Sequence, residues 1–112
     1  MKKFIVTYHA PASAAKQTAK LSKAEQAKGM AAWMTWAQKC GNQLVDMGSP
    51  LTNSEALSPK GSKKSNKNFA GYSVLQAKNM AEAKKLLKGH PHLGWNAACT
   101  IEVHETAAIP GM

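Results

Sequence analysis

The stretch FAGYSVLQAKNMAEAKKLLKGHPHLGWNAACTIEVHE, residues 69–105, decides the fold because it predicts a strand, a helix and a strand in succession. Its beginning, residues 69–78, is rich in the aromatic and β-branched side chains that strands favour. Asn79 then provides a helix N-cap with Glu82 three residues later, and a glycine and a proline follow the last apolar residue of the helix. Residues 99–105, CTIEVHE, predict the closing strand.

The first half of the chain predicts the same kinds of element. Residues 3–9, KFIVTYH, alternate their side chains between two faces and predict a first strand. Ser22 and Glu25 form a capping box, and the helix that they begin is expected to end at a glycine after Cys40. Residues 42–48, NQLVDMG, predict a second, weaker strand.

The resulting order of strand, helix, strand, strand, helix and strand is the ferredoxin-like βαββαβ plan. It predicts an α+β fold with a four-stranded antiparallel sheet and both helices on one face. The 112 residues, 44% of them hydrophobic, fit one domain with its own core over residues 1–112. Apolar side chains on the other sheet face would stay uncovered, so we expect a homodimer.

The charge of the chain narrows the class of partner. The formal net charge is +9, and all 15 basic residues are lysines. Without arginine, which contacts guanine and phosphate through two hydrogen bonds, a protein that reads nucleic acid specifically is not expected. Several lysines, including Lys63 and Lys64, fall in a long polar loop expected over residues 49–68. Such a loop is by default a solvated segment, and the alternatives are a lid over a small anion or salt-sensitive attraction to polyanions.

Cysteine usage and apolar runs bear on location. Cys40 and Cys99 match no disulfide framework and no activating motif, so we expect reduced, buried thiols. The longest apolar runs are too short for a transmembrane helix. The lysines and short apolar run of residues 1–9 belong to the first strand rather than to an export signal, and we expect a cytoplasmic protein without membrane partners.

Residues 70–105 resemble the C-terminal half of the YCII-related, or DGPF-type, family. That family shows a strand led by Gly-Tyr, a helix that starts with an acidic residue and alanine, a step of one residue and proline, and a closing strand of the form IEV. The matching positions are Gly71-Tyr72, Glu82-Ala83, His90-Pro91 and Ile101-Glu102-Val103. The first half is similar in layout, so the resemblance covers nearly the whole chain.

The resemblance implies a dimeric α/β barrel, in which two ferredoxin-like units pack their open sheet faces together. It also implies a small pocket between the sheet, the first helix and the long loop. Members are mostly of unknown function, and some are thought to be small-molecule enzymes that use a histidine and an aspartate. This chain departs from the pattern, because no histidine stands near Met30 and Ala31 and the long loop carries lysines where DGPF-type members carry carboxylates. The acid–base pair of the family therefore cannot be carried over.

His9 and Asp46 are the candidate catalytic residues. His9 ends the first strand on the side of Ile5 and Thr7, as a general acid or base at the mouth of a pocket or as an ordinary strand-end histidine. Asp46 is the carboxylate of the second strand, and it would orient His9 if both point into one pocket. The alternative is an exposed strand aspartate.

The candidate ligand-binding residues come from several elements. Trp36 and Tyr72 would stack on the flat part of a ligand, or pack in the core. Lys63 or Lys64 would meet the charge of an anion. His90 is included because it stands where YCII-type members often carry aspartate before the proline.

A metal site is the remaining possibility for the histidines. His90, His92, Cys99 and His104 are good zinc ligands by type, but their spacing matches no known zinc motif. We therefore expect neither a metal nor a cofactor, and we place Glu102 and His104 on a shared solvent or dimer face.

Together these features predict a homodimer that binds a small organic, anionic molecule and, in the enzyme version, transforms it by acid–base chemistry. One alternative is a non-catalytic binding or accessory module. The other is weak, nonspecific polyanion binding through the lysine-rich loop.

Overall fold

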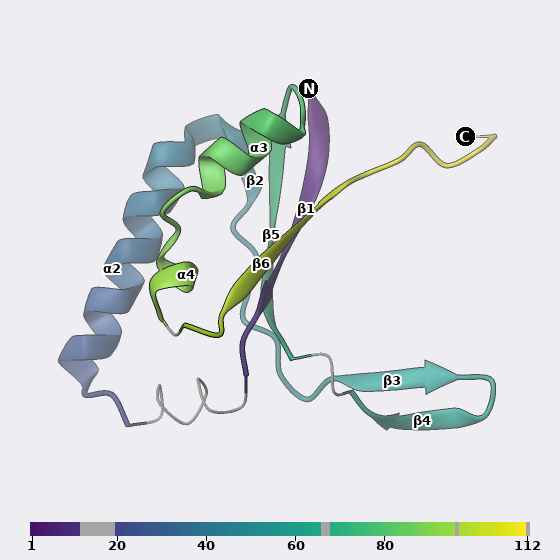
Figure 1. The fold of residues 1–112 in the computed structure, drawn as a ribbon, viewed down its shortest axis with the longest axis horizontal. Coiled ribbons are helices and arrows are strands. Elements are labelled where there is room, and N and C mark those ends of the chain that lie inside the picture. The colour runs from purple at the N-terminus through teal and green to yellow at the C-terminus, as the bar shows by residue number, and fades with distance from the viewer. Residues whose placement is uncertain (12–19, 66–67, 96, 112) are drawn as a thin grey trace.

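The computed structural model describes residues 1–11, 20–65, 68–95 and 97–111. It is an α+β fold in which one antiparallel sheet has the strand order β2–β5–β1–β6, with helices α2 and α3 on one face (Figure 1). The strands of this sheet are β1 (Lys2–His9), β2 (Leu44–Asp46), β5 (Phe69–Ala77) and β6 (Thr100–Glu105). The other elements are α2 (Lys23–Cys40), β3 (Glu55–Ser58), β4 (Gly61–Lys64), α3 (Met80–Leu87) and α4 (Pro91–Trp95).

Strand β1 lies inside the sheet and pairs antiparallel with both β5 and β6. Its alternating side chains separate two environments: Phe4, Val6 and Tyr8 are at most 2% exposed and belong to the core beneath the helices. Ile5 and Thr7 point to the opposite face. The strand order and the two strand–helix–strand units agree with the predicted ferredoxin-like plan.

The helix boundaries follow the predicted caps. The Ser22 side chain accepts a hydrogen bond from the Glu25 backbone N–H while the Glu25 carboxylate accepts one from the Ser22 N–H, so the capping box is confirmed. Gly41, with a φ of 59°, ends α2 in a conformation that favours glycine. The Asn79 side chain caps α3 by accepting from the Glu82 N–H.

Hydrogen bonds satisfy buried polar groups in the core between helices and sheet. The indole Nε1 of Trp36 donates to the backbone carbonyl of Leu86 at 2.8 Å and so joins α2 to α3. The Tyr8 hydroxyl donates to Ser73 Oγ at 2.8 Å, and Ser73 in turn donates to the Met47 carbonyl at 2.6 Å. In the described part of the chain, no helix has the length and apolar character that a membrane crossing requires.

Two predicted segments differ from the structure, one in its length and one in containing an additional helix. The strand expected over residues 42–48 is shorter, because a 3₁₀ turn occupies Gly41–Gln43 and Gly48, with a φ of 78°, turns the chain beyond β2. The segment after α3, expected as a loop, contains α4. Pro91 begins that helix at its first position, where proline is favoured.

The prediction of one long loop over residues 49–68 is wrong, because β3 and β4 form a β-hairpin within this segment. Glu55 lies opposite Lys64 and Leu57 opposite Ser62, and Gly61 follows the turn with a φ of 127°. Neither strand has a buried face, so the sequence lacks the apolar alternation that predicts strands.

Two segments project from the sheet on the side away from α2 and α3 (Figure 1). We call residues 55–64 the hairpin arm and residues 106–111 the tail. Each carries an exposed apolar side chain, Leu57 at 82% on the arm and Ile109 at 63% on the tail. The radius of gyration is 15.6 Å, where a compact 112-residue domain has about 13 Å. The chain is therefore more extended than a single domain of its length.

Candidate functional site

The sheet face that α2 and α3 leave uncovered carries a group of polar and aromatic side chains. We call it the open face. Strand pairing places Thr7 opposite both Tyr72 and Glu102, so these three side chains lie on this face together. Ile5 and Val74 face each other further along and give the open face an apolar middle. The remaining members used below are His9 and His104.

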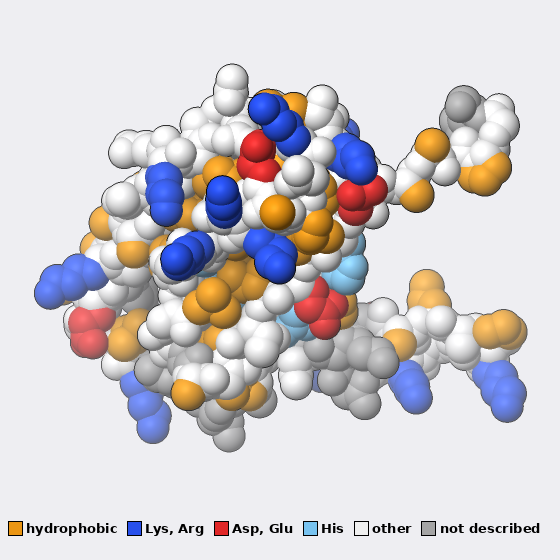
Figure 2. All heavy atoms as spheres, turned by 45° about the horizontal axis from the view of Figure 1, so that its top comes forward, with side chains coloured by type: hydrophobic (Ala, Val, Ile, Leu, Met, Phe, Trp, Pro, Cys, Tyr) orange, Lys and Arg blue, Asp and Glu red, His pale blue; other side chains and the backbone are white. Residues whose placement is uncertain are grey.

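His9 lies at the polar end of the open face, where β1 stops. Its Nε2 is 2.9 Å from Thr7 Oγ1 and 3.8 Å from Glu102 Oε1. The same Glu102 oxygen is 3.3 Å from His104 Nε2, so one carboxylate lies between two imidazoles. Figure 2 shows histidine and acidic side chains next to one another at one edge of the molecule. We call Thr7, His9, Glu102 and His104 the His9 site.

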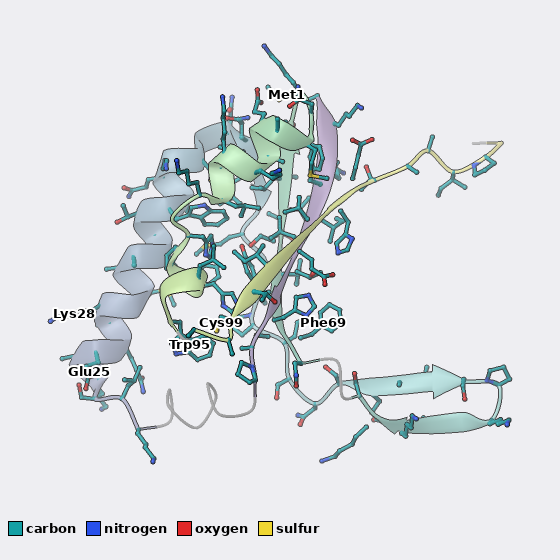
Figure 3. The ribbon with its side chains drawn as sticks, viewed as in Figure 1. Met1, Glu25, Lys28, Phe69, Trp95 and Cys99 are labelled. Atoms are coloured by element: carbon teal, nitrogen blue, oxygen red, sulfur yellow. The ribbon has the colours of Figure 1, made fainter. Side chains whose placement is uncertain are left out.

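An aromatic side chain connects the His9 site to a shallow cleft. The Phe69 ring centroid is 4.5 Å from that of His9, at an interplanar angle of 49°. Phe69 also lines a cleft of ≈ 470 Å³ at the base of the hairpin arm, together with Leu51 and Trp95. Figure 3 shows that Phe69 and Trp95 approach from opposite sides of the sheet. A flat organic molecule in this cleft would therefore contact Phe69, whose ring packs against that of His9.

The arrangement suits proton transfer. Histidine is the side chain most often used as a general acid or base, and the Glu102 and Thr7 oxygens lie beside the His9 Nε2. The His9 side chain is 16% exposed, which leaves it accessible while its neighbours fix its position. Among the described residues, no three His, Cys, Asp or Glu side chains gather closely enough to hold a metal ion.

Asp46, the predicted partner of His9, is engaged elsewhere. Its Oδ1 accepts a hydrogen bond from the Gly48 backbone N–H at 2.8 Å and so stabilises the turn after β2. Strands β2 and β1 are separated by β5 in the sheet, and Asp46 aligns with Val74 rather than with the end of β1. The structure does not bring Asp46 to His9; Glu102 occupies the position expected for it.

The space predicted as a pocket between sheet and first helix is filled by rings. Trp36 is 4% exposed, its indole N–H is used by Leu86, and its ring packs against Trp33 and His90. Trp36 is therefore a core residue. Tyr72, predicted to bind the same ligand, lies on the opposite face of the sheet.

His90 is also placed in this core, at 2% exposure. Its Nδ1 accepts a hydrogen bond from the His92 backbone N–H at 2.9 Å, which puts the proton of the neutral ring on Nε2. That Nε2 has no hydrogen-bond partner, and the rings of Trp33 and Trp36 lie 4.4 Å from the His90 ring. Burial, with a smaller contribution from His92, lowers the pKa of His90 to about 4, so the ring is neutral at pH 7.

The Tyr8 hydroxyl and the Cys40 thiol in the core both have raised pKa values. Burial raises the pKa of the Tyr8 hydroxyl to about 12, partly opposed by its hydrogen bond with Ser73 and supported by Cys40. Burial likewise raises the pKa of the Cys40 thiol, against the smaller opposing effect of Lys39. Neither group is poised to act as a nucleophile at neutral pH.

The predicted lysines Lys63 and Lys64 are on the hairpin arm, which points away from the sheet (Figure 1). Lys64 lines a second, open hollow of ≈ 550 Å³ at the base of the arm, together with Glu55 and with Asn53, Ser54 and Ser65. The two hollows share Asn53, Ser54 and Ser65, so Lys64 stands at the base of the arm, next to the cleft that Phe69 lines.

Comparison with known proteins adds no assignment: no family model matches the sequence, and no curated protein matches it.

Sequence reasoning placed His9 on the correct face and expected Glu102 and His104 to share one. It did not bring these residues together, because the contact depends on the β1–β6 register, which joins residues about 90 positions apart. Phe69 was expected only as a strand residue. The signal available was the strand order, which puts the first and last strands side by side.

Proposed function

We propose that the chain binds a small organic, anionic molecule at the His9 site and exchanges a proton with it. The observation that carries this proposal is the position of His9 Nε2, 2.9 Å from Thr7 Oγ1 and 3.8 Å from Glu102 Oε1, beside the Phe69 ring. A partly exposed imidazole beside a carboxylate is a common arrangement for a general acid or base.

Each neighbouring residue has a role in this proposal. His9 is the catalytic residue that takes or gives the proton. Glu102 is a positioning residue, because it acts on the imidazole and not on the ligand. Phe69 and Tyr72 hold the flat part of the ligand, since aromatic rings stack on such surfaces. The negative charge of the ligand is favoured by the net charge of +9.

The proposal includes a homodimer of the YCII-related type. Two copies that pack their open faces together would enclose the His9 site, and exclusion of water strengthens polar interactions with a bound anion. The half-buried Ile5 and Val74 supply the apolar middle of such a contact. The ferredoxin-like sheet with one uncovered face supports this arrangement.

Nonspecific polyanion binding is the second candidate. Lysine side chains gather over the end of the molecule formed by α3 (Figure 2), where Lys84, Lys85 and Lys88 are exposed. A lysine surface of this kind attracts any polyanion and loses it as salt is added.

A thermal-shift experiment separates the two candidates. The wild type and His9→Gln would be melted with benzoate, phthalate and citrate at millimolar concentrations, and with heparin, each at low and high salt. The proposal predicts that at least one carboxylate stabilises the wild type at both salt concentrations and leaves His9→Gln unchanged. Stabilisation by heparin alone, lost at high salt and retained by His9→Gln, would establish the polyanion candidate instead. No effect of any of the three carboxylates would refute the proposal.

A further inference from the structure

The hairpin arm has the properties of a segment that packs on another molecule. A two-stranded hairpin alone is marginally stable in water, and three or more strands or a packed face are needed to hold it. Every residue of β3 and β4 except Ala56 is exposed, and Leu57 shows 82% of its surface. The arm therefore exposes an apolar side chain and unpaired strand edges. It projects on the same side of the sheet as the open face (Figure 1).

The surface area of the chain is large enough to include such a contact. The accessible surface is 8069 Å², where a folded monomer of 12.0 kDa has about 6,000 Å². The excess of about 2,000 Å² is larger than the roughly 800 Å² that each partner buries in a standard interface. Figure 2 shows apolar side chains on both projecting segments.

Charge indicates which surface receives the arm. Lys60, Lys63 and Lys64 make the arm basic, with Glu55 as its acidic residue. In a chain with only 6 acidic residues, two stand on β6: Glu105 pairs with Lys2 of its own chain, and Glu102 lies on the open face opposite Thr7. β6 is the last strand of the sheet, and no described strand pairs with its outer edge. Another segment could therefore pack there. A basic arm and an acidic edge strand on the same chain are complementary between two copies.

We infer that the hairpin arm of one copy lies across the His9 end of the open face of a second copy, with Lys63 and Lys64 beside the Glu102 of that copy. The arm leaves the sheet at the end where β1 stops, so a two-fold axis parallel to β1 carries each arm past the His9 end of the other copy (Figure 1). The ligand site is then shared: one copy supplies His9 and the aromatic rings, and the other supplies the cations that meet the anion. This inference rests on the proposed function for the ligand, but the docking of the arm can be tested without it.

Crosslinking between differently tagged chains tests the docking. A Lys64→Cys chain is mixed with a mass-tagged His104→Cys chain, which keeps Glu102, and treated with a short bismaleimide. The native Cys40 and Cys99 are 3% and 6% exposed, and wild type run in parallel measures their background. The matched control replaces Lys64→Cys by Lys28→Cys, on an exposed residue of α2 that points away from the sheet (Figure 3). We expect mixed-mass dimer from the Lys64 pair at about ten times the yield of the Lys28 pair, as local concentration effects of this kind allow.

Equal yields from both pairs, or none from the Lys64 pair, would overturn the docking. A second experiment measures ligand binding by a double variant, Lys63→Gln with Lys64→Gln. The loss of charge-assisted contacts predicts that it binds benzoate about tenfold more weakly than the wild type. A His9-dependent benzoate effect that this double variant leaves unchanged would refute the shared site while the proposed function stands. Crosslinking without any His9-dependent ligand effect would refute the proposed function while the docking stands.

Discussion

His9 Nε2 lies 3.8 Å from Glu102 Oε1, and this relationship joins the first strand to the last on the face that no described helix covers. It replaces the His9–Asp46 pair that the sequence predicted. The replacement matters because Glu102 belongs to the strand adjacent to β1, whereas β5 separates Asp46 from it. Several consequences of the placement can be measured.

Asp46→Ala is expected to weaken the fold slightly and to leave ligand binding intact. The variant loses the hydrogen bond to the Gly48 N–H, which costs about 1 kcal/mol of stability. Any rise in melting temperature that benzoate produces in the wild type should recur, at the same size, in the variant. Loss of that rise would mean that Asp46 acts at the site after all. Denaturation with and without benzoate gives both quantities.

Trp36→Phe is expected to destabilise the chain by about 2 kcal/mol, because it removes the bond to the Leu86 carbonyl and leaves part of the core unfilled. Met34→Ala, on the exposed side of the same helix at 46% exposure, is the control and should change the free energy of unfolding by less than about 0.5 kcal/mol. Urea unfolding measures both. A Trp36→Phe variant as stable as wild type would show that Trp36 is not a core residue.

Gly48→Ala is expected to cost at least about 3 kcal/mol, since φ is 78° there and an added Cβ would lie 1.7 Å from the Tyr72 carbonyl oxygen. Gly29→Ala is the matched control. Gly29 lies within α2 with no atom within 4 Å of an added Cβ, so the same change should stabilise by about 0.5–1 kcal/mol. The opposite signs can be read from urea unfolding midpoints, and two changes of the same sign would contradict the turn geometry described for β2.

Stability should fall in mild acid because of His90. Its pKa is about 4 in the folded chain against 6.5 for the free side chain, so the unfolded state binds the proton more readily between these values. The contribution is present above pH 6.5 and is lost as the pH falls towards 4, by roughly 2–3 kcal/mol between pH 7.5 and 4.5. His90→Phe removes this group and should flatten that part of the pH dependence. An unchanged pH profile in His90→Phe would assign the acid sensitivity to other groups.

Local features of the fold could be predicted from the sequence. The capping box of Ser22 and Glu25, the alternation of β1 and the Asn79 cap depend on residues within a few positions, and each is found where expected. The burial along α2 does not follow from apolar character alone. Met30 and Met34 are 60% and 46% exposed, because only the later part of that helix has buried residues.

The candidate site depended on contacts that sequence spacing does not carry. Trp36 bonds to a residue 50 positions away, and this decides that it fills the core instead of lining a pocket. The hairpin arm was missed because its strands bury no face and so show no apolar period. Its lysines were predicted on a loop near the ligand, and the structure places them on this arm.

The four histidines of the chain can report where a ligand binds. His9 and His104 lie on the open face, whereas His90 and His92 are buried on the helix side. The ring resonances of all four can be followed by long-range ¹H–¹⁵N NMR during a benzoate titration at constant protein concentration. Binding at the His9 site predicts saturable shifts of the His9 and His104 rings with that of His90 unchanged, while His92, whose Nε2 lies 2.9 Å from the His9 carbonyl oxygen, is not used as a control. Shifts confined to His90 and His92 would place the ligand between the sheet and α2 and contradict binding at the His9 site.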